Sequence, residues 1–77
     1  MGKAKNICGG RVRRLRLALG LTTEEFSSCL RSSGVFLSPE QVVAIEDRER
    51  RVRDFEVVAL AKALRTTVTA LLGRGGR

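Results

Sequence analysis

The sequence predicts an all-α fold, a single compact domain of five short helices. Three observations support this prediction: apolar residues recur at helical spacing, helix-start signals precede four of the apolar stretches, and no segment alternates like a half-buried strand. The chain has 77 residues, a length that suits one domain and buries only roughly 60 to 65% of the surface exposed on unfolding. We therefore expect one thin core and no deep active-site cavity.

The first helix is expected at about residues 10–19, after a flexible basic arm at residues 1–8. Gly20 follows this helix and suits its C-terminal cap. Its apolar positions at helical spacing are Val12, Leu15 and Leu19.

The second helix is expected at about residues 23–30 and has a capping box at its start. Thr22 is the cap candidate, and Glu25 lies three residues later, where its side chain can accept from the Thr22 amide. Leu21 and Phe26 match a hydrophobic staple. The residues expected to face the core are Phe26, Leu30 and, as a small core residue, Cys29.

The third helix, at about residues 39–47, has the most complete start signal in the chain. Ser38 and Gln41 form a capping box, and Pro39 fits the first helical position, where its missing N–H costs nothing. The staple pairs Leu37 with Val42. Val42 and Ile45 are expected to face inward, and the Ser- and Gly-containing segment before this helix is expected to be an extended turn.

Two further helices complete the expected domain. The fourth spans about residues 55–64 with Asp54 as its cap, and a short fifth spans about 68–72 between the cap Thr67 and Gly73. The apolar stripe expected on the fourth helix contains Val57, Val58, Ala61 and Leu64. The domain then covers residues 9–73, and the tail at 74–77 is expected to be disordered.

The charge is strongly basic and unevenly distributed. Lys and Arg total 15 against 8 Asp and Glu, a net charge of +7. Residues 1–20 carry six basic groups and no acidic one, residues 21–47 carry one basic and five acidic groups, and residues 48–53 carry four basic groups and one acidic. This balance favours a polyanionic partner, with nucleic acid the commonest; a basic surface kept for solubility is the alternative.

Several classes of site and location are not indicated by the sequence. Cys8 and Cys29 are isolated and the chain has no His, so neither a metal site nor a redox pair nor any other cofactor is expected. No apolar run approaches the roughly 20 residues of a membrane span, and no apolar block of signal-peptide length follows the first lysines. We expect a cytoplasmic protein that does not enter a membrane.

Three segments in order carry a family resemblance: GGRVRRLRLALGLTTEEF, LSPEQVVAIE and FEVVALAKALRTTVTALLG. Together they resemble the phage-repressor and Cro type of helix-turn-helix domain, also called XRE type, over about residues 10–73. The resemblance implies that the second and third helices form the motif and that the third lies in the DNA major groove. It also implies a dimer that reads two half-sites.

Carried over to this chain, the resemblance assigns base reading to the third helix. The base-facing positions would be Ser38, Pro39, Glu40, Gln41 and Ala44, with Val43 at the margin. Thr23 stands where the family often has a phosphate-contacting glutamine. Arg16 and Glu46 occupy the places of a frequent structural ion pair, which has physical sense because a charge facing a thin core needs a partner. A phosphate contact is the rival role for Arg16.

The departures from the family pattern make direct readout sparse. Pro39 donates no hydrogen bond, and Glu40 repels phosphate while offering only an acceptor, suited to a cytosine amino group. Base readout then depends mainly on Gln41, which could bond adenine through two hydrogen bonds, with Ser38 as a further contact.

An arginine-rich loop follows the third helix and suits phosphate contacts: Arg48, Arg50, Arg51 and Arg53. The alternative is a solvated loop whose positive charges are partly balanced by Glu49, Asp54 and Glu56. Lys3 and Lys5 either track a minor groove or lie in a floppy terminus.

The sequence favours a DNA-binding transcriptional regulator that acts as a homodimer on double-stranded DNA. The alternative is a protein-interaction module of the same fold, antitoxin- or anti-regulator-like, because the motif itself is acidic. Val68, Leu71 and Leu72 either form an apolar dimer edge or close the core. No enzyme activity and no small-molecule substrate are expected, because no nucleophile lies beside a plausible base.

Overall fold

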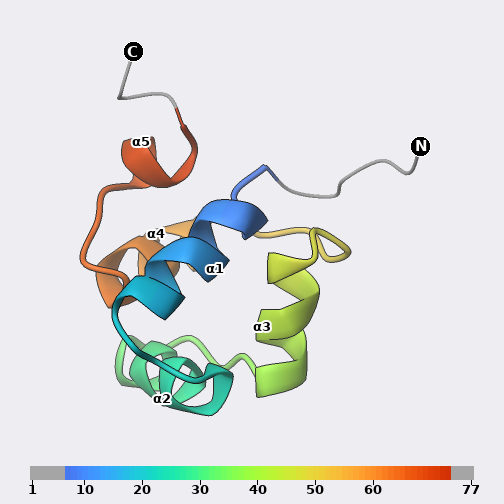
Figure 1. Ribbon diagram of the computed structural model, residues 1–77, viewed down its shortest axis with the longest axis vertical. Coiled ribbons are helices and arrows are strands. Elements are labelled where there is room, and N and C mark those ends of the chain that lie inside the picture. Colours follow the sequence, from blue (N-terminus) through green and yellow to red (C-terminus); the bar gives the residue numbers. More distant parts are fainter. Residues whose placement is uncertain (1–6, 74–77) are drawn as a thin grey trace.

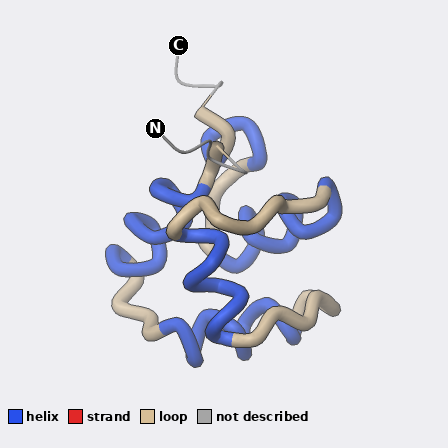
Figure 2. Tube along the Cα trace, turned by 90° about the vertical axis from the view of Figure 1, so that its right-hand side faces the viewer, coloured by secondary structure: helices blue, strands red, loops and turns tan. Residues whose placement is uncertain are grey.

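A computed structural model describes residues 7–73, in which every regular element is a helix. The five helices are α1 (Gly9–Ala18), α2 (Thr23–Ser32), α3 (Pro39–Glu46), α4 (Asp54–Ala63) and α5 (Val68–Leu71). Figure 1 shows their arrangement, and Figure 2 shows only helix and loop over the described residues. The all-α prediction is confirmed, including the extended turn between α2 and α3.

The starts of α2 and α3 are built as predicted. At α2, the Glu25 amide donates to Thr22 Oγ1 at 3.0 Å, and the Thr22 amide donates to Glu25 Oε1 at 2.8 Å. At α3, the Gln41 amide donates to Ser38 Oγ at 3.2 Å, and the Ser38 amide donates to Gln41 Oε1 at 2.9 Å. Each box satisfies amides that the first helical turn leaves without a partner, so both starts are set locally.

The start of α4 differs from the prediction. Arg53, not Asp54, is the N-cap residue, and Asp54 is the first residue of the helix. Glu56 accepts a hydrogen bond from the Arg53 amide at 2.9 Å, which is the acceptor half of a capping box. The Glu56 side chain is only 6% exposed, so this helix start is also part of the interior.

Each described helix is followed by a residue with left-handed backbone, at three glycines and two arginines: Gly20, Gly34, Arg48, Arg65 and Gly73. The hydrogen bond from the Leu21 amide to the Arg16 carbonyl, 3.1 Å, is the long bond of a Schellman motif, and α2, α3 and α4 end in the same way. Arg48 has a φ of 61°, a conformation that costs a non-glycine residue about 1 to 2 kcal/mol.

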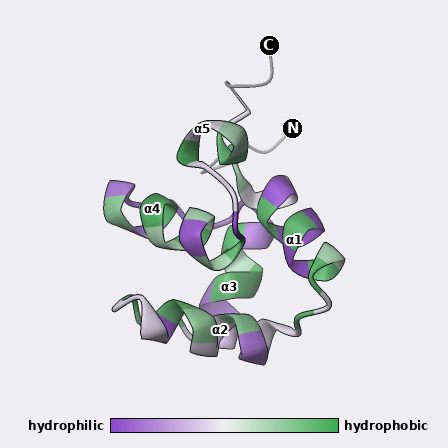
Figure 3. Ribbon diagram, turned by 90° about the vertical axis from the view of Figure 1, so that its left-hand side faces the viewer, coloured by the Kyte–Doolittle hydropathy of each residue, from purple (hydrophilic) through white to green (hydrophobic). Residues whose placement is uncertain are grey.

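The core collects side chains from all five helices. α2 packs against α3 and α4, α1 packs against α3, and α5 packs against α4. Figures 1 and 3 show α5 at one end of the molecule and α2 at the other, with α1, α3 and α4 between them. The largest fully buried side chains are Phe26, Leu30, Ile45, Leu60, Leu71, Val12, Val42 and Cys8.

Several predicted core positions are wrong. Cys29, expected in the core with Phe26 and Leu30, is exposed. Ser27 is buried on the same helix instead. At about 100° per residue, Ser27 and Cys29 flank the Phe26–Leu30 stripe on opposite sides at equal angles, so helical spacing does not decide which of the two is buried. The Ser27 hydroxyl donates to the Leu37 carbonyl and so joins α2 to the turn before α3.

Leu19 and Val58 were also expected inside and are exposed by 40% and 44%. Leu19 is the C-cap of α1, beyond the helical stripe, and Leu60 takes the central position on α4. Cys8, expected in the arm, is 1% exposed, so packing begins one residue before the predicted domain boundary. Burial raises the pKa of its thiol.

The C-terminal helix closes the core. Leu71 is fully buried, while Val68 and Leu72 are half-buried and pack against the core. Of the two alternatives for these residues, the structure favours closure of the core. The remaining expectations for the arm and tail, those for Lys3 and Lys5 among them, concern residues outside the described range. Within residues 7–73 no helix has the length and apolar character needed to cross a bilayer.

Candidate nucleic-acid interface

The start of α3 presents the polar residues that were expected to read bases. Ser38, Glu40 and Gln41 are exposed, Ala44 is half-buried, and Val43 is 42% exposed. The opposite side of the same helix is fixed in the core by Val42 and Ile45. α3 is therefore held rigidly by one face while the other is free for contact.

The capping box limits what Gln41 can offer. Its Oε1 already accepts from the Ser38 amide, which fixes the side-chain amide at the helix start. A two-pronged bond to adenine requires this same oxygen to accept from the adenine N6 amino group. The Nε2 donors remain available, while Oε1 keeps a second lone pair whose direction is set by its bond to the Ser38 amide.

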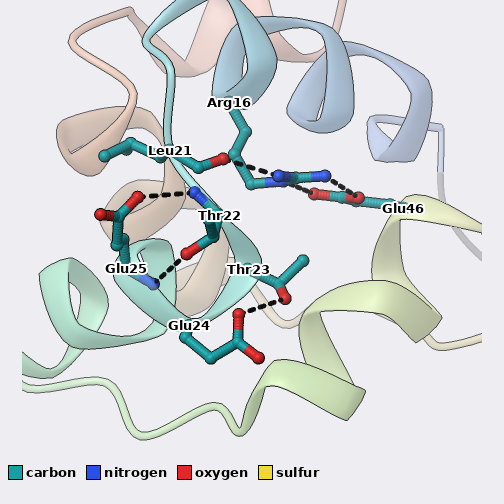
Figure 4. Close-up of polar contacts among 7 residues, drawn as sticks. All are labelled: Arg16, Leu21, Thr22, Thr23, Glu24, Glu25 and Glu46. Atoms are coloured by element: carbon teal, nitrogen blue, oxygen red, sulfur yellow. Dashed lines mark hydrogen bonds and ion pairs between the residues drawn. The ribbon is translucent and has the colours of Figure 1, made fainter.

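Acidic side chains surround the α2–α3 surface. Glu40 and Asp47 are exposed on and after α3, and Glu24 and Glu25 are exposed in the first turn of α2. Thr23, the expected phosphate contact, is half-buried, and its hydroxyl donates to Glu24 Oε1 at 3.3 Å (Figure 4). Phosphate therefore meets negative charge at both helix starts, which weakens the case for Thr23.

Arg16 and Glu46 form the expected ion pair. Arg16 Nε lies 2.6 Å from Glu46 Oε2 and its Nη2 lies 3.1 Å from Oε1, while Nη1 donates to the Leu21 carbonyl at 2.7 Å (Figure 4). The hydrogen bond to Glu46 raises the pKa of the guanidinium. Both side chains are at most 10% exposed, so this pair joins α1 to α3 and Arg16 is not placed to contact phosphate.

Arg50 is also committed to a carboxylate. Its Nη1 and Nη2 donate to the two oxygens of Glu56 at 2.9 and 3.1 Å, and Nη1 also reaches the Arg51 carbonyl at 2.9 Å. The hydrogen bond from Arg50 holds the pKa of Glu56 below its usual value. For Arg50 the structure favours the alternative role, an ion pair with Glu56, over the expected phosphate contact.

The other three arginines of the loop are exposed. Arg48, Arg51 and Arg53 have no ion pair among the residues that the structure describes. A surface hollow of about 570 Å³ is lined by Glu49, Arg50, Arg51, Val52 and Arg53. We call the three exposed side chains, Arg48, Arg51 and Arg53, the loop arginines; they form a cationic edge directly after α3.

A close backbone contact fixes where this edge lies. A Cβ placed on Gly9 would lie 2.2 Å from the Ile45 carbonyl oxygen and 2.7 Å from Arg48 Cγ. The start of α1 therefore lies against the end of α3, with the Arg48 stem beside it. Sequence reasoning did not identify this contact, because a glycine before a helix carries no sign of which backbone it approaches.

The chain matches no protein-family model, no curated protein and no solved structure. A functional assignment therefore depends on the α3 surface and the loop arginines themselves.

Proposed function

We propose that this protein is a DNA-binding transcriptional regulator that places α3 in the major groove of double-stranded DNA and binds as a homodimer. The observation that supports this most strongly is an exposed start of α3 on the same segment as three exposed arginines of the following loop, which have no ion pair within residues 7–73. A helix in this setting can enter a groove about 12 Å wide while the arginines bind the flanking phosphates.

In this proposal the loop arginines supply most of the affinity. Each guanidinium that neutralises a phosphate releases condensed counterions, a gain that does not depend on base sequence. The face of α3 carries Glu40 and ends at Asp47, so it contributes repulsion as well as contacts. Binding is then governed by the loop, and α3 contributes position.

Base reading in this proposal is sparse and depends on few side chains. Gln41, with its oxygen held by the Ser38 amide, donates to base acceptors such as guanine N7 and O6. Glu40 accepts from a cytosine amino group. Ser38 and Ala44 define the remaining contact surface, the first through its hydroxyl and the second through a methyl group.

The acidic surface favours a second candidate function, a protein-interaction module that uses α3 to dock a partner with a basic surface. Glu24, Glu25, Glu40 and Asp47 are all exposed on the two helices that would face DNA. This candidate differs from the first in its partner and not in its fold.

Selection of bound duplexes from a random pool distinguishes the two functions. The proposal predicts enrichment of two half-sites separated by about one helical turn, as expected of a dimer. A pool that remains unenriched, together with a pull-down that yields one stoichiometric protein partner, would instead support the interaction module.

A further inference from the structure

A second hollow lies between α1 and the C-terminal part of the chain, and no loop arginine lines it. It measures about 180 Å³ and is lined by Arg11, Arg14, Leu15, Thr66 and Ala70. Arg11 and Arg14 are three residues apart on α1, a spacing that places side chains on the same helix surface. Two arginines therefore border one small hollow.

The guanidinium of Arg11 lies close to the backbone at the end of α5. A Cβ on Gly73 would lie 2.6 Å from Arg11 Nη2 and 2.7 Å from Cζ, so the guanidinium rests on a backbone without a side chain. Gly73 has a φ of 78°, the left-handed conformation that ends α5. The backbone at the end of α5 therefore lies against Arg11, which lines the hollow.

Within residues 7–73, no carboxylate forms an ion pair with either arginine. Residues 7–23 and 57–73 contain no Asp or Glu, and neither Arg11 nor Arg14 has an ion pair among the described residues. Arg13, Lys62 and Arg65 are exposed in the same two segments and add to the positive potential. Neighbouring like charges repel each other, and an anion placed between them would relieve that repulsion.

We propose that the hollow between α1 and α5 binds a phosphoryl group, held by the guanidinium groups of Arg11 and Arg14 with the Thr66 hydroxyl as a further donor. Guanidinium groups match the tetrahedral oxygens of phosphate through paired charge-assisted hydrogen bonds. Drug-sized ligands occupy cavities of about 300 to 1,000 Å³. The smaller volume suits one phosphate, either free or as part of a nucleic-acid backbone.

This site goes beyond the proposed contact of α3 with DNA and does not depend on it. The two sources of phosphate are separated by two titrations followed by NMR through the Arg Nε–H signals and the Thr66 amide. One uses inorganic phosphate against chloride at equal ionic strength, and the other uses a short DNA duplex. The proposal predicts saturable shifts at Arg11, Arg14 and Thr66 in at least one titration.

Arg11→Ala and Arg14→Ala test the two side chains, and Arg13→Ala is the matched control because Arg13 is exposed on α1 but does not line the hollow. All three residues are exposed, so a preserved amide spectrum is expected. Loss of one charge-assisted hydrogen-bonding group should weaken the Thr66 titration roughly tenfold or more in the first two variants and leave it unchanged in the control.

If both titrations shift these signals, free phosphate is sufficient for binding. If only the duplex shifts them, the ligand is a phosphate of the nucleic-acid backbone. Equal responses in Arg11→Ala and Arg13→Ala, or no saturable shift with either ligand, would overturn the proposal. The signals of Gln41 and Arg51 report the α3 surface separately, so failure of one site is distinguishable from failure of the other.

Discussion

Gly9 shows how a single missing side chain decides the contact between two helices. Its Cα approaches so closely that an added Cβ would lie 2.2 Å from the Ile45 carbonyl oxygen, whereas a Cβ on Gly10 would meet no atom within 4 Å. Both residues belong to α1, so the two positions differ mainly in their surroundings. They form a matched pair for testing the α1–α3 contact.

Gly9→Ala should destabilise the protein by about 1 to 3 kcal/mol, the usual range for forced overpacking. Gly10→Ala should stabilise it by about 0.5 to 1 kcal/mol, because alanine is the better helix former at an exposed position. Urea unfolding of the two variants measures both effects. Equal changes in the two variants would contradict the close contact.

Gln41 has two roles that one substitution separates. Gln41→Glu keeps an oxygen acceptor for the Ser38 amide but removes both Nε2 donors, whereas Gln41→Ala removes acceptor and donors together. The first variant should retain stability within about 0.5 kcal/mol and the second should lose about 0.5 to 1 kcal/mol. Thermal unfolding measures this difference.

Duplex affinity should fall in both Gln41 variants if the donors read bases. Fluorescence anisotropy with a selected duplex measures it. Unchanged affinity in Gln41→Glu would show that the side chain serves only the helix start.

Single-residue burial could be predicted only in part. The apolar spacing correctly placed Phe26 and Leu30 inside, but residue type misled at Cys29 and Ser27. The preference of cysteine for the interior is a statistical tendency, whereas burial of Ser27 depends on a carbonyl that tertiary structure brings to it. No local pattern in the sequence predicts that hydrogen-bond acceptor.

At the scale of elements, helix starts were predicted best because their determinants are local. The boxes at Thr22 and Ser38 are each complete within four residues of sequence. The start of α4 was misassigned by one residue because Asp54 is a common cap type, while the decisive acceptor, Glu56, is also engaged by Arg50 across the loop.

The Arg50–Glu56 pair predicts a pH dependence of stability. The pKa of Glu56 is lower in the folded state than in the unfolded chain, first because of the hydrogen bond from Arg50. Its contribution is therefore fully present above the unfolded pKa, about 4.3, and is lost as the pH falls through the lower folded value. Glu56→Gln lacks this titration.

The stability difference between wild type and Glu56→Gln should thus be constant near neutral pH and shrink below about pH 5. Urea unfolding across the acidic range measures it. A Glu56→Gln curve parallel to wild type down to acidic pH would contradict the pair.

For the whole molecule, the charge distribution was readable from the sequence but its geometry was not. The basic start, acidic middle and arginine-rich loop are visible in the linear order. Which arginines form ion pairs depends on how the chain folds: Arg16 meets Glu46 thirty residues away, and Arg50 meets the buried carboxylate of Glu56 across the loop. Folding thus divides the arginines between structure and surface.

The proposed function requires that the free loop arginines, more than other surface cations, govern DNA binding. Arg51→Ala with Arg53→Ala removes two of them, and Arg13→Ala with Lys62→Ala removes equal charge elsewhere on the exposed surface. The arginine stem at position 48 packs beside Gly9, so Arg48 is left unchanged to keep the fold intact.

The most direct measurement is the slope of log affinity against log salt concentration for duplex binding between about 50 and 200 mM salt. The wild type should show a steep negative slope, and the Arg51→Ala, Arg53→Ala variant should lose about two units of it, near one for each phosphate contact. The control pair should change it much less. An equal loss in both variants, or a wild type without measurable duplex binding, would contradict the proposed function.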